Sequence, residues 1–156
     1  WVMGTRGLIS AEQVEAAIRP MDPYTIQTGL ICLENTHNSG GGTIYPLATI
    51  ERIRAVAATH SIPMHLDGAR LFNAIAATTL PPASYAQHFD TLSVCLSKGL
   101  GAPAGSLLMM NDLTLLDKGR NFPDFALADQ AGNCGSKQHY FVGRNTSLTV
   151  FARNQP

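Results

Sequence analysis

Charged residues are few in this sequence, and neither sign is in excess. Lys and Arg together number 11, as do Asp and Glu, so the formal net charge at pH 7 is zero. No basic run of the kind that follows a phosphate backbone occurs anywhere along the chain. This balance disfavours nucleic acid and anionic membrane surfaces as partners.

Long apolar runs are also missing. No segment reaches the roughly 18 consecutive apolar residues of a membrane span, and the first residues lack the apolar core of a signal peptide. We therefore expect a cytoplasmic protein. The chain opens on Trp1 rather than on Met, which leads us to expect that a segment upstream is absent.

Cysteine is scarce, with Cys32, Cys95 and Cys134 at wide spacings. An odd number so distributed disfavours a disulfide framework, and we predict no metal site. Cys32 and Cys95 lie within apolar segments that are typical of strands. We therefore expect reduced, buried thiols, the usual state of free cysteine in globular proteins.

What is present is a globular composition. The chain has 156 residues, of which 45% are hydrophobic and 14% charged, enough for one domain with a core. Ser10 and Gln13 have the spacing of a capping box, in which each side chain satisfies a free backbone N–H at a helix start. This pattern predicts a helix that runs to about Ile18 and stops near Pro20.

Short apolar runs then alternate along the chain with longer segments whose apolar residues recur at helical spacing. Short runs predict strands, and apolar residues at helical spacing predict helices between them. The expected strands are Gly29–Leu33, Pro63–Leu66 and Thr91–Leu96, and the expected helices are Pro46–His60 and Leu71–Ala77. This order predicts an α/β fold with a parallel-rich sheet and crossover helices. Residues 118–156 show little periodicity.

Four chemically capable side chains follow the ends of the predicted strands. In parallel sheets, ligands bind at the carboxyl ends of the strands. His37 follows the first strand, Asp67 and Arg70 follow the second, and Lys98 follows the third. We therefore expect these four residues at one edge of the sheet.

Each of the four also has a simpler interpretation. Asp67 could pair with a pyridinium nitrogen, or it could cap a helix or pair with Arg70. Lys98, between Ser97 and Gly99, could form a Schiff base or be an ordinary surface lysine. Arg70 suits a carboxylate ligand or a phenolate oxygen, and His37 suits acid/base chemistry or a hydrogen-bonded loop.

Ser39–Gly42 (SGGG) is a further candidate, because backbone amides of a glycine-rich loop can hold a phosphate. However, the sequence has neither the G-x-x-x-x-G-K-[ST] nor the G-x-G-x-x-G pattern. We interpret this segment as a flexible loop.

Three segments resemble the signatures of the low-specificity threonine aldolases. They are Leu33–Asn38 (LENTHN), His65–Ala74 (HLDGARLFNA) and Ser93–Ser106 (SVCLSKGLGAPAGS). The resemblance extends from about Gly7 to Asp112 and implies part of the large domain of a fold-type I pyridoxal-phosphate (PLP) enzyme, related to aspartate aminotransferase. It also implies a domain over 1–112 and a divergent tail over 113–156.

The resemblance implies a role for each of the four residues. Lys98 would be the Schiff-base lysine, and Asp67 would be the partner of the pyridinium nitrogen. Arg70 would contact the substrate carboxylate or the cofactor phenolate. His37 would lie near the β-hydroxyl of the substrate.

The implied reaction is the reversible cleavage of L-threonine or L-allo-threonine to glycine and an aldehyde, as in threonine catabolism and glycine biosynthesis. The partners would be the amino-acid substrate and, in a full-length parent, further copies in a dimer or tetramer. A racemase or a β-eliminating lyase on the same scaffold is the nearest alternative.

The chain also departs from the family pattern. The family has an upstream phosphate-binding Ser-Gly-Thr turn and a histidine that stacks on the cofactor ring, and this sequence begins after them. Downstream, Asn121–Phe125 and Asn133–Lys137 replace the family's continuation. These departures suggest a frameshifted, mis-spliced or truncated product, and we expect an isolated fragment to be weakly active or inactive.

Overall fold

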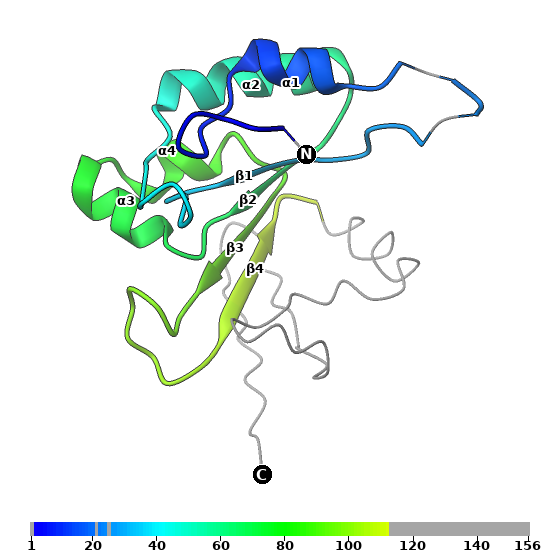
Figure 1. The fold of residues 1–156 in the computed structure, drawn as a ribbon. Coiled ribbons are helices and arrows are strands. Elements are labelled where there is room, and N and C mark those ends of the chain that lie inside the picture. The colour runs from blue at the N-terminus through cyan, green and yellow to red at the C-terminus, as the bar shows by residue number, and fades with distance from the viewer. Residues whose placement is uncertain (1, 21, 25, 113–156) are drawn as a thin grey trace.

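The computed structural model describes residues 2–20, 22–24 and 26–112 (Figure 1). The predicted tail over 113–156, including Cys134, lies outside the described residues. In the described part, no helix is long and apolar enough to cross a membrane.

Four strands of the described part form one sheet, in the order β1 (Ile31–Glu34), β2 (Met64–Asp67), β3 (Thr91–Cys95) and β4 (Ser106–Met110). The first three strands are parallel, and β4 pairs antiparallel with β3. Three strands therefore lie within two residues of their predicted bounds, and the α/β, parallel-rich prediction is confirmed. The sequence analysis did not predict β4.

One helix precedes β1, and helices connect the three parallel strands. They are α1 (Ala11–Ala17), α2 (Leu47–Thr59), α3 (Leu71–Thr78) and α4 (Pro82–Ala86). The capping box of α1 is confirmed, because Ser10 Oγ accepts from the Gln13 N–H at 3.2 Å and Gln13 Oε1 accepts from the Ser10 N–H at 2.9 Å. The short helix α4 was not predicted.

The apolar positions of α2 recur at helical spacing and so form one face. Ile50, Ile53 and Ala57 on that face are fully buried. Pro46 is the N-cap residue, which agrees with its predicted place at the start of this helix. The helix therefore packs on the sheet through the side that the sequence predicts.

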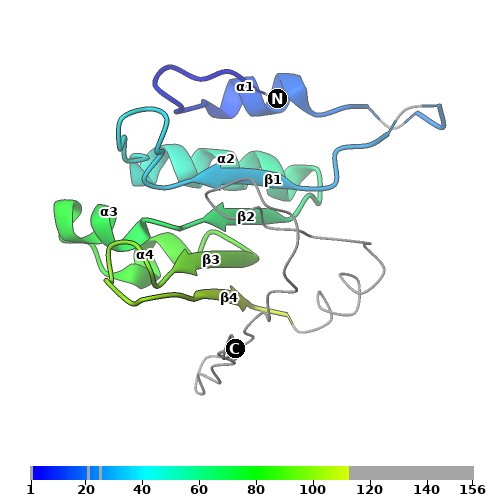
Figure 2. The ribbon, with the colours of Figure 1, turned by 60° about the horizontal axis from the view of Figure 1, so that its bottom comes forward.

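The three parallel strands have one apolar and one polar face, because successive side chains along a strand point to opposite sides. Figure 2 shows the four strands side by side, with α2 and α4 behind them. The buried strand residues that face the helices are Ile31, Leu33, Met64, Leu66, Leu92 and Val94. The other face, here called the open face, carries Cys32, Glu34, His65, Asp67, Thr91, Ser93 and Cys95.

This alternation corrects the expectation of buried thiols. Cys32 is exposed and Cys95 is half-buried, and both are free. Buried and less buried positions alternate along each strand. Both cysteines occupy less buried positions, so their side chains point to the open face. Hydrophobic sequence context alone does not tell the two faces apart.

Candidate functional site

The carboxyl ends of β1, β2 and β3 are aligned by backbone hydrogen bonds. The Asn35 N–H donates to Asp67 O at 2.9 Å, and the Gly68 N–H donates to Ser93 O at 2.8 Å. Figure 2 accordingly shows the loops that follow the three strands at the same end of the sheet, on the left. This end is where parallel sheets bind ligands.

The four residues singled out from the sequence belong to this end. Asp67 is the last residue of β2, and His37 lies in the loop after β1. Arg70 is the N-cap residue of α3, and Lys98 lies in the turn after β3. Across the described residues, no hydrogen bond or ion pair joins any two of them.

Asp67 is half-buried on the open face, with one oxygen engaged locally. Its Oδ1 accepts from the Ala69 N–H at 3.0 Å, which shapes the turn into α3. It does not cap that helix, whose N-cap residue Arg70 makes no side-chain capping bond. Within the part of the chain that the structure describes, Asp67 makes no ion pair with Arg70, and Oδ2 has no partner.

Two neighbours on the open face respond to the Asp67 charge. Burial lowers the pKa of His65, and the Asp67 carboxylate partly opposes this effect. The Cys32 thiol keeps contact with solvent, yet partial desolvation raises its pKa and the Asp67 charge raises it further. Burial is the larger cause in both cases, so this part of the open face disfavours the charged form of either side chain, and the Asp67 carboxylate adds a smaller contribution that favours positive over negative charge.

His65 links β2 to β3 on this face. Its Nδ1 lies 2.7 Å from Thr91 Oγ1, and its Nε2 lies 3.5 Å from Ser93 Oγ. The sequence analysis did not select His65 or Ser93. The signal that could have found them is strand alternation, since both share the side of Asp67.

His37 is held by its loop. Its Nδ1 accepts from the Gly40 N–H at 3.0 Å, and its Nε2 lies 3.6 Å from Glu34 Oε2. Glu34 is fixed in turn, because its Oε1 accepts from the Asn38 N–H at 3.0 Å. His37 is thus a hydrogen-bonded loop histidine with a carboxylate beside it, and the sequence analysis did not select Glu34.

Lys98 is half-buried and, among the described residues, makes no ion pair. Its carbonyl accepts from the Gly101 N–H at 3.0 Å, which closes the turn after β3. The same turn touches α3, because a Cβ at Gly99 would stand 2.6 Å from Asn73 Oδ1. The turn that carries Lys98 therefore packs beside the helix that begins after Arg70.

The loop Ser39–Gly42 has little capacity for a phosphate. Its amides already donate within the loop: Gly40 to His37 Nδ1, Gly41 to Asn38 O at 3.0 Å and Gly42 to His37 O at 3.0 Å. The interpretation as a loop is confirmed, and the phosphate alternative is not supported.

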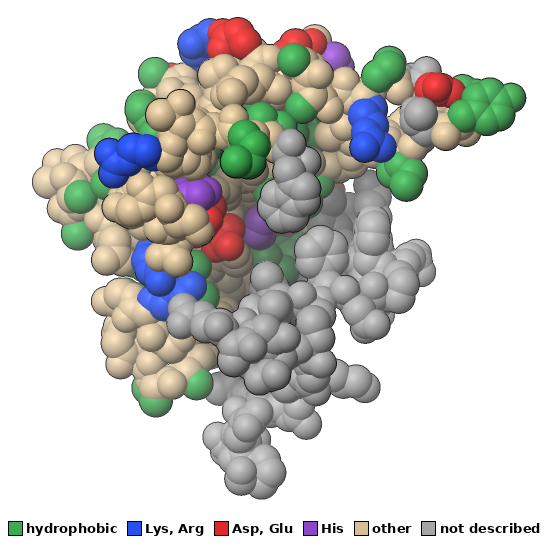
Figure 3. All heavy atoms as spheres, viewed as in Figure 1, with side chains coloured by type: hydrophobic (Ala, Val, Ile, Leu, Met, Phe, Trp, Pro, Cys, Tyr) green, Lys and Arg blue, Asp and Glu red, His purple; other side chains and the backbone are tan. Residues whose placement is uncertain are grey.

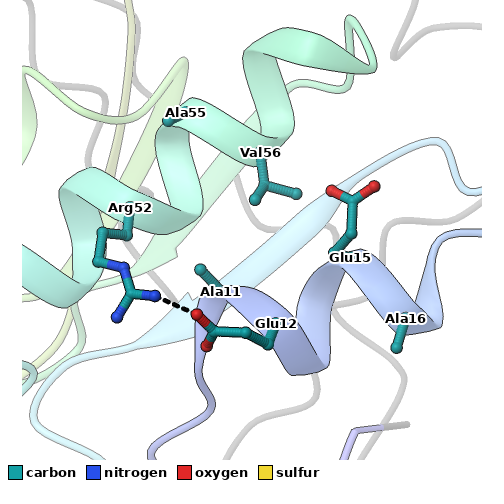
Figure 4. Close-up of a pocket in the computed structure, with 7 residues that line it drawn as sticks. All are labelled: Ala11, Glu12, Glu15, Ala16, Arg52, Ala55 and Val56. Carbon is teal, nitrogen blue, oxygen red and sulfur yellow. Dashed lines mark hydrogen bonds and ion pairs between the residues drawn. The ribbon is translucent and has the colours of Figure 1, made fainter.

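Histidine and acidic side chains gather around a recess in the middle of the face that Figure 3 shows, with Lys and Arg side chains beside them. A second, shallow groove lies between α1 and α2 (Figure 4). An ion pair between Arg52 and Glu12 crosses it, and Ala11, Ala55 and Val56 supply apolar lining. None of the four candidate residues lines this groove.

Comparisons with known proteins agree with this geometry. The model of the beta-eliminating lyase family matches residues 2–143. Low-specificity L-threonine aldolase 1 of Arabidopsis thaliana is 44% identical over 105 residues, which cover 66% of this chain and 29% of that protein. A probable low-specificity L-threonine aldolase of Schizosaccharomyces pombe is 45% identical over 102 residues, covering 65% and 26%.

A solved structure also matches. The threonine aldolase of Leishmania major superposes with a TM-score of 0.55 at 26% identity, over 61% of this chain and 28% of that one. The chain thus spans less than a third of the length of each of these three relatives.

Proposed function

Since the chain belongs to the beta-eliminating lyase family, a family of PLP-dependent enzymes, we propose that it forms the cofactor-binding part of an aldehyde-lyase that cleaves L-threonine or L-allo-threonine to glycine and an aldehyde. The observation that carries this proposal is that Asp67 and Lys98 both lie at the carboxyl end of the parallel strands, where, among the described residues, Asp67 Oδ2 and the Lys98 amine have no partner. The names of the Arabidopsis and fission-yeast relatives support the same substrate class.

The residues present fit PLP. The cofactor needs a carboxylate beside its ring nitrogen and an amine for its aldehyde. Asp67 Oδ2 has no partner among the described residues and so is available for the first purpose, and the Asp67 charge acts on the pKa of both His65 and Cys32 in the direction that favours a nearby cation. Lys98 is available for the second, because no carboxylate in the described part of the chain neutralises its ammonium group.

When bound, PLP supplies an electron sink for the bond that breaks at the substrate's Cα. The chain's own residues bind and orient. Asp67 would hold the proton on the ring nitrogen of the cofactor by charge pairing, and Lys98 would hold the cofactor through its amine. Arg70 offers a bidentate donor for a carboxylate. His37, with its Glu34 neighbour, holds or moves a proton at the substrate's β-hydroxyl.

The cellular setting follows from the same proposal. We propose a cytoplasmic enzyme of threonine catabolism and glycine biosynthesis, a dimer or tetramer in its full-length form. We also propose that residues 1–156 alone turn over slowly, since they span 29% of the Arabidopsis relative. Groups that relatives draw from the remaining length would be lacking.

Cofactor attachment is the direct test. After incubation with PLP and reduction with borohydride, peptide mapping should find the pyridoxyl label on Lys98. Lys118 and Lys137 are the internal comparison, because they are the other lysines of the chain. A label on either of them in place of Lys98 would contradict the assignment.

Asp67→Asn separates binding from ring activation. The amide keeps the size of the carboxylate but not its charge, so the label on Lys98 should remain while cleavage of threonine falls by about a hundredfold or more. Aldehyde release from the full-length parent, with and without the substitution, gives this ratio. Equal rates would return Asp67 to the role of a turn residue.

A further inference from the structure

The imidazole of His37 is enclosed on three sides. Gly7 lies against the ring, because a Cβ built there would stand 2.2 Å from Nδ1 and 2.3 Å from both Cγ and Cε1. The Gly40 N–H donates to Nδ1 at 3.0 Å, and Glu34 Oε2 lies 3.6 Å from Nε2. We call Gly7, Gly40 and Glu34 the His37 clamp.

The loop that carries Gly7 is itself fixed. The buried Tyr45 hydroxyl donates to Gly7 O at 3.1 Å and accepts from the Ile9 N–H at 2.9 Å. Thr43 Oγ1 donates to Arg6 O at 2.8 Å. Gly7 has φ +82°, a conformation that favours glycine, so the close approach to the ring depends on the absent side chain.

The clamp determines which nitrogen of the neutral ring carries the proton. A backbone N–H can only donate, so the nitrogen that faces Gly40 must be the unprotonated one. Nε2 therefore carries the proton, and it is the nitrogen beside Glu34. A neutral His37 in this position donates a hydrogen bond from Nε2 and has no free nitrogen with which to accept a proton.

Glu34 is placed to accept one. It is paired in register with Asp67 on the open face, and its Oε1 is anchored by the Asn38 N–H while Oε2 faces His37. A hydroxyl between Nε2 and Oε2 would find a donor for its oxygen and an acceptor for its proton. A carboxylate and an imidazole N–H side by side thus match the two hydrogen-bonding capacities of one alcohol.

We propose that the clamp fixes His37 with its proton on Nε2, and that the pair binds the β-hydroxyl of the substrate, with His37 as the hydrogen-bond donor and Glu34 as the proton acceptor. In the transfer, the hydroxyl O–H bond breaks, the substrate oxygen keeps the electron pair, and the proton bonds to Glu34 Oε2. The proposal rests on the proposed function for the identity of the alcohol. Gly7 is a positioning residue, because it acts through His37.

Imidazole nitrogen NMR of the ¹⁵N-labelled full chain tests the clamp without any cofactor. Spectra are recorded well above the ordinary histidine pKa of about 6.5. The signals that are absent from the spectrum of a His37→Gln variant are those of the His37 ring. The expected spectrum shows an unprotonated Nδ1 and a protonated Nε2. Protonation on Nδ1, or an average of both forms, would overturn the proposal.

Gly7→Ala should move the His37 signals or mix the two forms, because the new methyl group occupies the place of the ring. The matched control is Gly29→Ala, where a Cβ meets nothing within 4 Å. The other histidine signals report that the variant still folds. If these stay in place and the His37 signals also do not change, Gly7 does not position the ring.

Kinetics test the role of Glu34. Glu34→Gln keeps an acceptor oxygen near Nε2 but cannot take up the proton, so kcat for threonine cleavage by the full-length parent should fall by about a hundredfold or more while KM changes little. Glu51→Gln is the control, since Glu51 stands near His88 on another part of the surface. A normal kcat in Glu34→Gln would overturn the acceptor role.

The two proposals fail separately. A full-length parent that takes the label on Lys98 but cleaves no threonine contradicts the proposed activity. The NMR spectra support or overturn the clamp in either case.

Discussion

Asp90 connects three parts of the fold through one carboxylate. Substitutions of Asp90 should lower the free energy of unfolding by an amount that depends on which of its bonds they remove. Arg54 of α2 donates to both of its oxygens, at 2.6 and 3.3 Å, and the Met64 N–H at the start of β2 donates to Oδ2 at 2.7 Å. Met64 is fully buried, whereas the Arg54 and Asp90 side chains are 36% and 28% exposed. The hydrogen bond from the Met64 N–H is therefore better shielded from water than the ion pair.

These exposures set the expected magnitudes. Asp90→Asn keeps an oxygen for the Met64 N–H and loses only the partly exposed ion pair, so it should lower the free energy of unfolding by about 0.2–1 kcal/mol. Asp90→Ala also leaves the Met64 N–H without a partner, which adds about 1–3 kcal/mol. The alanine variant should therefore lie well below the asparagine variant.

Urea unfolding followed by far-UV circular dichroism measures both values. With a slope of about 1–3 kcal/mol per molar urea, a loss of about 2 kcal/mol moves the midpoint by roughly 1 M. Glu51→Ala, at an exposed position, serves as the control and should be near neutral. If Asp90→Asn and Asp90→Ala are equally destabilised, the loss of the charge accounts for the change in stability, and the hydrogen bond from the Met64 N–H contributes little.

The same carboxylate predicts a pH dependence. Burial by itself raises the pKa of Asp90, but the bonds from Arg54 and from the Met64 N–H outweigh it and hold the pKa below its ordinary value. A carboxyl group with a lowered folded pKa contributes stability above its unfolded pKa, about 3.9 for Asp. The difference between wild type and Asp90→Asn should thus be constant near neutral pH. It should shrink as the pH falls below about 4 and through the folded pKa.

Two further substitutions test the N-terminal loop and helix. Tyr45→Phe removes the hydroxyl that bonds to both Gly7 O and the Ile9 N–H, so the free energy of unfolding should fall by about 1–3 kcal/mol; an unchanged urea midpoint would show that this hydroxyl is not needed to hold the loop. Ser10→Ala removes the acceptor of the capping box and should cost about 1 kcal/mol, whereas a loss above about 3 kcal/mol would mean that Ser10 does more than cap α1.

Local patterns were enough to predict most of the parallel part of the sheet. The capping box located α1, and the spacing of Ile50, Ile53 and Ala57 located the buried face of α2. β4 was missed because Ser106–Met110 is a short apolar run after a Gly- and Pro-containing stretch, and its pairing with β3 is a tertiary contact. The five-residue helix α4 is too short for periodicity to show.

The site was predictable at the level of the sheet end and not at the level of contacts. Topology places Asp67 at the carboxyl end of β2, and His37, Arg70 and Lys98 shortly after the carboxyl ends of the three parallel strands. Glu34 was not selected, because its importance comes from the loop that turns His37 back toward it. Gly7 was not selected either, since its contact with the ring joins segments that are distant in the sequence.

The strand order also bears on how the chain acquires its structure. Among the described residues, each strand pairs with its neighbour in sequence, and the connections run over residues 35–63, 68–90 and 96–105. No pairing has to wait for a distant segment, so the entropy lost on closing each loop is modest. The β1–α2–β2 unit can therefore form during synthesis, while the ribosome is still adding β3. Each later strand can then pair with the edge of a sheet that is already folded.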